Sequence, residues 1–137
     1  MRGLNDPVKR REVALLATLL RLTVFAILES YVRRAKENDV ARSFPHFDHF
    51  VSFDGFSNGR IWIFWEPNSY SVDILHVTPQ LIHCRIGFDH HIVVATFVYT
   101  FNTYLLRWSL LSNLRLLGPL NEPWCIMGHF NSVMYSH

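Results

Sequence analysis

The amino-acid sequence predicts one α/β or α+β domain, in which a mixed β-sheet carries helices on its outer face. Three observations predict this class. A helical pattern near the start is followed at once by an apolar strand pattern, the middle of the chain is a run of strand patterns joined by short turns, and a second helical pattern precedes a last short strand. The run of strands excludes a fold in which helices and parallel strands simply alternate. The length of 137 residues fits one domain.

The first predicted element is a helix that begins at Asn5-Asp6-Pro7. Asn5 or Asp6 can cap the free N–H groups, and Pro7 suits the first helical turn. Apolar residues then recur at helical spacing at Val13, Leu16, Leu19 and Leu20. Residues 23–28 are β-branched or aromatic and apolar throughout, which predicts a buried strand. Residues 31–44 are highly charged, which predicts a solvated helix or a long loop.

The rest of the chain is predicted to be strands and one helix. Strands are predicted over residues 49–53, 60–65, 70–77, 81–86, 91–99 and 124–127, with turn residues between most of them. A helix is predicted over residues 104–117, and Gly118-Pro119 ends it. Its apolar residues are Leu105, Leu106, Trp108, Leu110, Leu114 and Leu117.

The composition excludes several classes of protein. Half of the residues are hydrophobic and 18% are charged, which argues against a disordered chain. The net charge of +2 is too small for a protein that binds nucleic acid by charge alone. Cys84 and Cys125 lie far apart in the sequence, so they predict no disulfide framework and no paired-cysteine zinc site.

The most apolar stretch covers residues 13–28. Arg21 interrupts it, and it is shorter than the roughly 20 residues that a membrane-spanning helix needs. It ends at Glu29 rather than at small residues, so it does not predict a signal peptide either. The sequence therefore predicts no targeting segment, no transmembrane segment and no membrane partner. A small membrane-associated protein built on this stretch is kept as an alternative.

Six stretches of the chain carry a resemblance to a known family. They are RGLNDPVKRREV at residues 2–13, ILES at 27–30, GRIWIFWEPNSYSVDIL at 59–75, QLIHCRI at 80–86, TFVYTFN at 96–102 and PWCIMGHFN at 123–131. Together they resemble the endonuclease domain of plant LINE-type (non-LTR) retrotransposons, which belongs to the endonuclease/exonuclease/phosphatase family. The resemblance implies a four-layered sandwich of two packed mixed sheets with outer helices. It also implies metal-dependent hydrolysis of DNA phosphodiesters, with DNA as partner and a nuclear location.

The resemblance implies roles for several residues. Glu29, at the end of the first predicted strand, matches the Glu that binds Mg²⁺ or Mn²⁺. Tyr99 and Asn102 match a Tyr-x-x-Asn motif that approaches the scissile phosphate, and Asn131 matches the last residue of a Gly-Asp-Phe-Asn motif. The residues alone also allow a plainer interpretation. Glu29 then is a surface carboxylate, Asn102 caps the helix that follows, and Tyr99 and Asn131 are ordinary strand-end and turn residues.

His129 is the main departure from the family pattern, because it stands where the motif has its catalytic Asp. Neutral imidazole can act as a base, but it suits Zn²⁺ better than Mg²⁺, which prefers oxygen ligands. Losing a carboxylate weakens metal binding and water activation together. We therefore expect metal binding to be weakened or lost and the chain to be catalytically inactive.

The resemblance also predicts that residues 1–137 are a truncated domain. The family opens with a Trp-Asn pair before x-Arg-Gly-Leu, and Met1 stands at the x position. The family's later motifs, including a terminal Asp-His pair, have no match. The first strand and the C-terminal half are therefore expected to be missing and the second sheet to be largely absent. The apolar strands 60–65 and 91–99 would then be exposed, which predicts self-association or, alternatively, a non-catalytic protein-interaction module.

Overall fold

The computed structural model of the chain describes residues 3–28, 30, 32–53, 59–100, 103–118 and 121–129. Its helices are α1 (Pro7–Leu19), α2 (Glu37–Arg42) and α3 (Tyr104–Leu117), with short 3-10 helices at Gly3–Asn5 and Arg34–Lys36. Its strands are β1 (Val24–Leu28), β2 (Asp48–Phe53), β3 (Gly59–Trp65), β4 (Ser71–Thr78), β5 (Leu81–Phe88), β6 (His91–Tyr99) and β7 (Trp124–His129). Every strand predicted from the sequence is present, with ends that differ by at most two residues.

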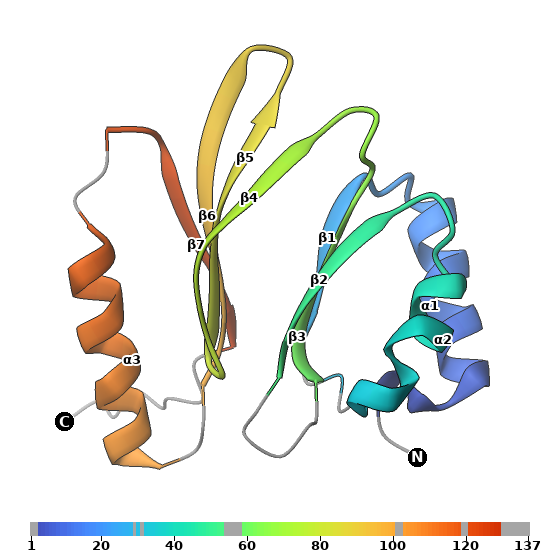
Figure 1. Cartoon of the computed structure of the whole chain (residues 1–137), viewed down its shortest axis with the longest axis horizontal. Helices are drawn as coiled ribbons and strands as arrows, with labels where there is room; N and C mark the ends of the chain where they lie inside the picture. Colours follow the sequence, from blue (N-terminus) through green and yellow to red (C-terminus); the bar gives the residue numbers. More distant parts are fainter. Residues whose placement is uncertain are drawn as a thin grey trace, which may run out of the picture.

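The elements form four layers (Figure 1). One sheet has the order β1-β3-β2 and is antiparallel, and α1 and α2 cover its outer face. The other has the order β4-β5-β6-β7, in which β6 and β7 run parallel, and α3 covers its outer face. This arrangement confirms the α+β sandwich with outer helices. The expectation that the second sheet is largely absent was wrong, because β4 to β7 form it.

The two sheets pack against each other through alternate residues of their central strands. Ile61 and Ile63 of β3 meet Ile82, Cys84 and Phe97 of the other sheet in one buried cluster. Each such side chain contributes about 1.5–3 kcal/mol when it is removed from water. This packing explains why the two strands expected to be exposed are not. The predicted strand 60–65 lies within β3, between β1 and β2, and the predicted strand 91–99 is β6, between β5 and β7.

The outer face of the first sheet is aromatic. Phe25 stacks on Phe64 with ring centroids 5.0 Å apart, and Phe44, which follows α2, contacts both rings. These rings fill the space beneath the helices. The helix α1 therefore approaches the sheet through its smaller side chains, with Ala17 buried.

The N-terminus of α1 is as predicted. The Asp6 carboxylate accepts a hydrogen bond from the backbone N–H of Val8 at 3.0 Å, and Pro7 opens the helix. Its predicted apolar face is wrong in part. Val13 packs on the core, but Leu16, Leu19 and Leu20 are more than half exposed. Helical periodicity predicts an apolar stripe on α1. Because the aromatic layer occupies the space beneath the helix, the neighbouring side with Val13, Ala14 and Ala17 is the one that faces inward.

On the other sheet, α3 matches its prediction more closely. Leu110 is buried against Leu81 of β5 and Val98 of β6, and Leu114 and Leu117 pack on the same cluster. Leu105 and Trp108, also assigned to the apolar face, are exposed. The strand β7 lies mostly exposed because it is the edge of its sheet. None of the helices in the described ranges has both the length and the apolar content that crossing a bilayer requires.

Candidate functional site

Four strand ends meet at one edge of the sandwich (Figure 1). They are the ends of β1, β6 and β7 and the start of β3. Hydrogen bonds join them across both sheets: Ser30 N–H donates to the Arg60 carbonyl at 3.3 Å, and the Arg60 guanidinium donates to the Tyr99 carbonyl at 3.3 Å. Thr100 N–H donates to the His129 carbonyl at 3.0 Å. We call these residues the strand-end corner.

Tyr99 and His129 are the two predicted site residues that the structure describes and brings together. They lie opposite each other in the β6–β7 pairing, and their rings stack with centroids 5.7 Å apart and an angle of 28° between the planes. Parallel pairing carries both strands to the same edge of the sheet. The Tyr99 ring is half-buried and the His129 side chain is exposed, so imidazole is the group that this corner presents to solvent.

Glu29, Asn102 and Asn131 lie outside the described residues. The chain on either side of Glu29 is well anchored. Leu28 pairs with Ile61, and the buried Ser30 hydroxyl donates a hydrogen bond to the Gly59 carbonyl at 3.0 Å. The flanking residues of Glu29 thus belong to the strand-end corner.

Arg60 is a member of the corner that the sequence analysis did not single out. Its side chain is only 7% exposed. The guanidinium carbon lies 4.6 Å from the centre of the Tyr99 ring, and Nε donates to the Pro79 carbonyl at 3.0 Å. The sequence feature that could have indicated this role is a lone charged residue at the start of an apolar strand. Arginine is seldom buried without a specific set of partners, so such a position predicts a structural or binding role.

The described groups of the corner are a guanidinium, a phenol, an imidazole and two hydroxyls. Within the described ranges, no three His, Cys, Asp or Glu side chains gather closely enough to hold a metal ion. Mg²⁺ prefers several oxygen ligands in near-octahedral geometry, and the exposed imidazole supplies none. The described donor set by itself therefore does not fit Mg²⁺. Arginine and imidazole are instead suited to contacting an anionic group such as a phosphate.

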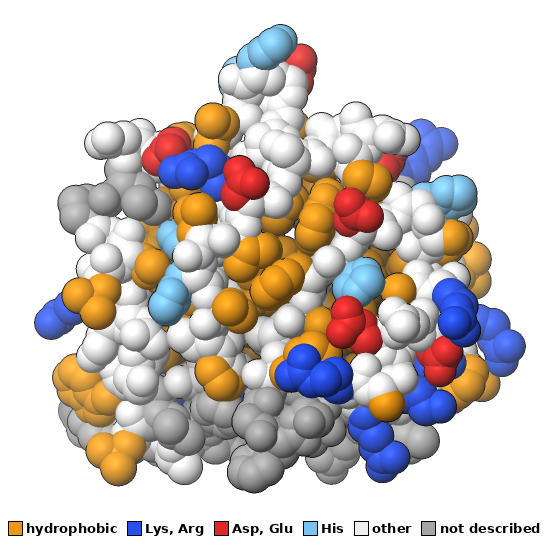
Figure 2. Space-filling view, viewed as in Figure 1, with side chains coloured by type: hydrophobic (Ala, Val, Ile, Leu, Met, Phe, Trp, Pro, Cys, Tyr) orange, Lys and Arg blue, Asp and Glu red, His pale blue; other side chains and the backbone are white. Residues whose placement is uncertain are grey.

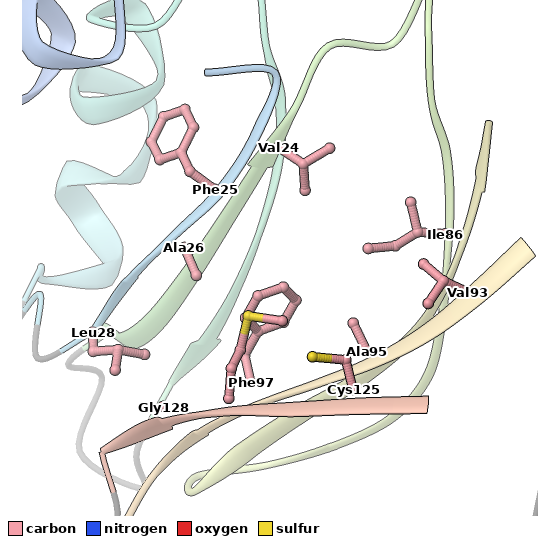
Figure 3. Close-up of a pocket in the computed structure, with 11 residues that line it drawn as sticks. Val24, Phe25, Ala26, Leu28, Ile86, Val93, Ala95, Phe97, Cys125 and Gly128 are labelled. Atoms are coloured by element: carbon pink, nitrogen blue, oxygen red, sulfur yellow. The ribbon is translucent and has the colours of Figure 1, made fainter. Parts of the chain in front are cut away.

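An apolar pocket of about 400 Å³ opens beside the corner, between the edge strands β1 and β7 (Figure 3). Val24, Ala26 and Leu28 line it from β1, and Cys125 and Met127 line it from β7. It holds no carboxylate or imidazole, so it is a packing surface rather than a reaction site.

The thiol of Cys84 is buried and packs between the sheets. Burial raises its pKa to about 12. The thiol is therefore protonated at neutral pH and is not a nucleophile. The neighbouring His83 lies on the other face of β5, where its Nδ1 is 2.7 Å from the Thr96 hydroxyl. These two residues do not form a catalytic pair.

The sequence matches no model of a protein family and no curated protein. Its structure does have close likenesses. The endonuclease domain of TRAS1, a telomere-specific non-LTR retrotransposon, superposes with a TM-score of 0.72 at 14% identity, over 90% of this chain and 54% of that chain. D. rerio TDP2 complexed with single strand DNA product superposes with a TM-score of 0.70 at 14% identity, over 96% of this chain and 56% of that chain. An endonuclease/exonuclease/phosphatase family protein from Bacteroides thetaiotaomicron superposes with a TM-score of 0.64 at 14% identity, over 95% of this chain and 60% of that chain.

This chain has the endonuclease/exonuclease/phosphatase fold. The fold expected from the sequence resemblance is thereby confirmed. The chain spans between 54% and 60% of the length of these three proteins. Another protein with a similar structure is ANGEL2, a 2′,3′-cyclic phosphatase, with a TM-score of 0.65 at 10% identity.

Proposed function

We propose that this chain is the first part of a nuclease-like domain of LINE retrotransposon origin, of the plant type, and that it does not cleave DNA by itself. The observation that carries the proposal is the stacked pair of Tyr99 and His129 at the strand-end corner. The pair lies on an endonuclease/exonuclease/phosphatase fold, with imidazole at the position where the resembling motif has a carboxylate.

The chemistry supports inactivity. Phosphodiester hydrolysis needs a cation on the phosphate oxygens, an activated water and donors for the developing negative charge. Mg²⁺ or Mn²⁺ would supply the first two when bound. Glu29 is the carboxylate that remains for such an ion, and His129 replaces the second. Arg60 and His129 still supply positive charge and hydrogen-bond donors, so we propose that the corner binds the phosphate of a nucleic acid without cleaving it.

The domain boundaries belong to the same proposal. The matched region is between 54% and 60% of each of the three similar structures, so part of each lies outside it. The pocket between β1 and β7 is apolar, and both strands are sheet edges. Further strands added along these edges would cover the pocket. A nuclear location follows from the same origin.

A nicking assay tests the proposed inactivity. Supercoiled plasmid is incubated with the chain in Mg²⁺ and, separately, in Mn²⁺, and relaxed circles are quantified on a gel. We expect no relaxation above the buffer control, because the site lacks the Asp carboxylate. Robust nicking by the wild-type chain would overturn inactivity, and nicking that persists in Glu29→Ala would overturn the metal assignment.

A metal-binding measurement tests the reason for inactivity. We expect His129→Asp to bind Mn²⁺ more tightly than the wild-type chain by roughly tenfold or more, since a carboxylate is a far better ligand for hard cations than imidazole. Isothermal titration calorimetry reports the affinity. His46→Asp, a substitution at another exposed histidine, is the matched control and should leave the affinity unchanged. Equal affinity in the wild type and His129→Asp would contradict the assignment.

A second candidate function is a non-catalytic protein-interaction module. The observation in its favour is the exposed apolar edge of β7, where Ile126 and Met127 are each 41% exposed beside the pocket. An open edge strand can pair with a strand of another protein. If the module depends on this edge, Met127→Lys should abolish capture of a partner and leave the thermal stability of the chain unchanged.

A further inference from the structure

The exposed side of α1 is apolar mainly in the second half of the helix. The exposed residues are Val8, Leu15, Leu16, Leu19 and Leu20, and between 51% and 70% of each is open to solvent. We call the four leucines the leucine stripe. Leu15 and Leu19 lie on the side of the helix opposite Ala17, which is buried. Exposed apolar residues clustered in this way mark an interaction site more often than isolated ones do.

Basic side chains flank the leucine stripe. At 100° per residue, Arg11 lies beside the stripe and Lys9 lies in line with its Leu16 and Leu20 edge in the first half of the helix, and both are exposed. Arg21 lies two residues after the end of the helix and is also exposed. Glu12 is the acidic residue of α1 and lies on the stripe's side in the first half of the helix. An apolar face bordered by lysine and arginine is the pattern of a helix that lies in a membrane interface.

The outer layer that contains α1 and α2 is also positively charged. Residues 3–42 hold eight of the 13 Lys and Arg residues of the chain, namely Lys9, Arg10, Arg11, Arg21, Arg33, Arg34, Lys36 and Arg42. They hold five of its 11 acidic residues. Figure 2 shows blue side chains among hydrophobic ones on the side where α1 and α2 lie. A positively charged layer of this kind complements anionic lipid head groups.

The shape of the surface favours a bilayer over a protein partner. A partner that receives an amphipathic helix usually buries it in a groove and contacts both of its flanks. Here the inner side of α1 is fixed on the aromatic layer of its own sheet, so only one convex side is available. A bilayer interface accepts such a side to a depth of roughly 5–10 Å.

We propose that the leucine stripe and its basic flanks dock this chain on the surface of a membrane rich in anionic lipids. The docking is peripheral and needs no spanning segment. It is independent of the proposed nuclease origin, because it uses the outer layer rather than the strand-end corner. It also revises the expectation that the chain has no membrane partner.

A vesicle flotation assay tests the proposal with the full chain. Vesicles of phosphatidylcholine alone are compared with vesicles that also contain phosphatidylserine, and the protein fraction that floats is measured. We expect binding only to the phosphatidylserine vesicles, with binding lost at high salt. The Leu16→Glu/Leu19→Glu double variant should abolish binding. The Lys9→Glu/Arg11→Glu variant should weaken it by about tenfold or more, since each basic residue near an anionic surface contributes to affinity.

The helix α3 provides the matched control. Leu105 and Leu116 are 79% and 84% exposed, yet they lie on the opposite outer layer. Leu105→Glu/Leu116→Glu should leave vesicle binding intact. Equal loss in the α1 and α3 variants, equal binding to both kinds of vesicle, or no binding at all would each overturn the proposal. So would light scattering that shows a dimer which Leu16→Glu/Leu19→Glu dissociates without any vesicle binding, because the occupant of the stripe would then be a second copy.

Folding of the variants is checked by circular dichroism. The substituted leucines are exposed, so we expect the melting curve of Leu16→Glu/Leu19→Glu to match that of the wild-type chain. If this variant does not fold, the charge-reversal variant decides the question by itself. Undiminished binding of Lys9→Glu/Arg11→Glu to phosphatidylserine vesicles would then overturn the proposal.

Discussion

Arg60 joins segments that are far apart in the sequence. Its backbone carbonyl accepts from Ser30 after β1, and its guanidinium reaches the Pro79 carbonyl between β4 and β5 and the Tyr99 carbonyl at the end of β6. It also lies over the Tyr99 ring. One buried cation thus fixes Tyr99, which in turn stacks on His129. The geometry of the strand-end corner depends on this side chain.

Replacing Arg60 tests that dependence. We expect Arg60→Met to lower the free energy of unfolding by about 3 kcal/mol, because two part-buried hydrogen bonds from a buried charged donor are lost. Urea unfolding measures the loss. Arg34 is the control, because it lies over the Phe53 ring at 3.9 Å but is exposed, so Arg34→Met should cost less than about 1 kcal/mol. Equal losses in the two variants would show that Arg60 does not hold the corner together.

At the scale of elements, the packing of α3 on its sheet covers a polar cluster. Trp124 Nε1 donates to the Thr96 hydroxyl at 2.8 Å, and the same hydroxyl lies 2.7 Å from Nδ1 of His83. His83 is 2% exposed. Burial lowers its pKa from the usual 6.5, and His76 and Arg85 lower it further. The neutral ring is therefore the form that fits this cluster.

Acid should destabilise the fold through His83. Because its pKa is lower in the folded state, the unfolded chain binds more protons below pH 6.5, and stability falls as the pH drops from 6.5 toward the folded-state value. The slope is at most about 1.4 kcal/mol per pH unit. Urea unfolding between about pH 8 and pH 5 measures it.

Variants separate His83 from other titrating groups. We expect His83→Gln to be less stable at neutral pH but to show a flatter dependence below pH 6.5 than the wild-type chain. The same substitution at the exposed His46 should leave the slope unchanged. A wild-type slope retained in His83→Gln would show that another group is responsible.

At the scale of the whole molecule, the two sheets stabilise each other. The cluster between them takes Ile61 and Ile63 from one sheet and Ile82, Ile86 and Phe97 from the other. Neither sheet has another apolar layer to cover these side chains. We therefore expect the described part of the chain to unfold as one cooperative unit.

Truncating this core tests the coupling between the sheets. Phe97 is 4% exposed, and we expect Phe97→Ala to cost about 3–5 kcal/mol through lost burial and a residual cavity. Phe88 at 40% exposure is the control, and Phe88→Ala should cost much less. Tryptophan fluorescence and far-ultraviolet circular dichroism should give coincident unfolding curves. Curves that separate in Phe97→Ala alone would show that the sheets unfold independently.

The sequence by itself determined the order and kind of the elements. The apolar run of residues 91–99 and the turn at 78–80 are local signals, and the strands they predict are present. The capping of α1 by Asp6 is equally local. The resemblance to a nuclease fold could also be recognised from the sequence, because the six short stretches occur in the same order as in the family.

Only the tertiary structure decided which surfaces are covered. The aromatic layer of Phe25, Phe44 and Phe64 forms from three separate segments. Because these rings fill the space beneath α1, the leucines of the helix face solvent. The contact of Arg60 with Tyr99 joins residues 39 positions apart. Sequence periodicity fixes which side chains share a face, but burial of that face depends on the volume that distant segments leave free.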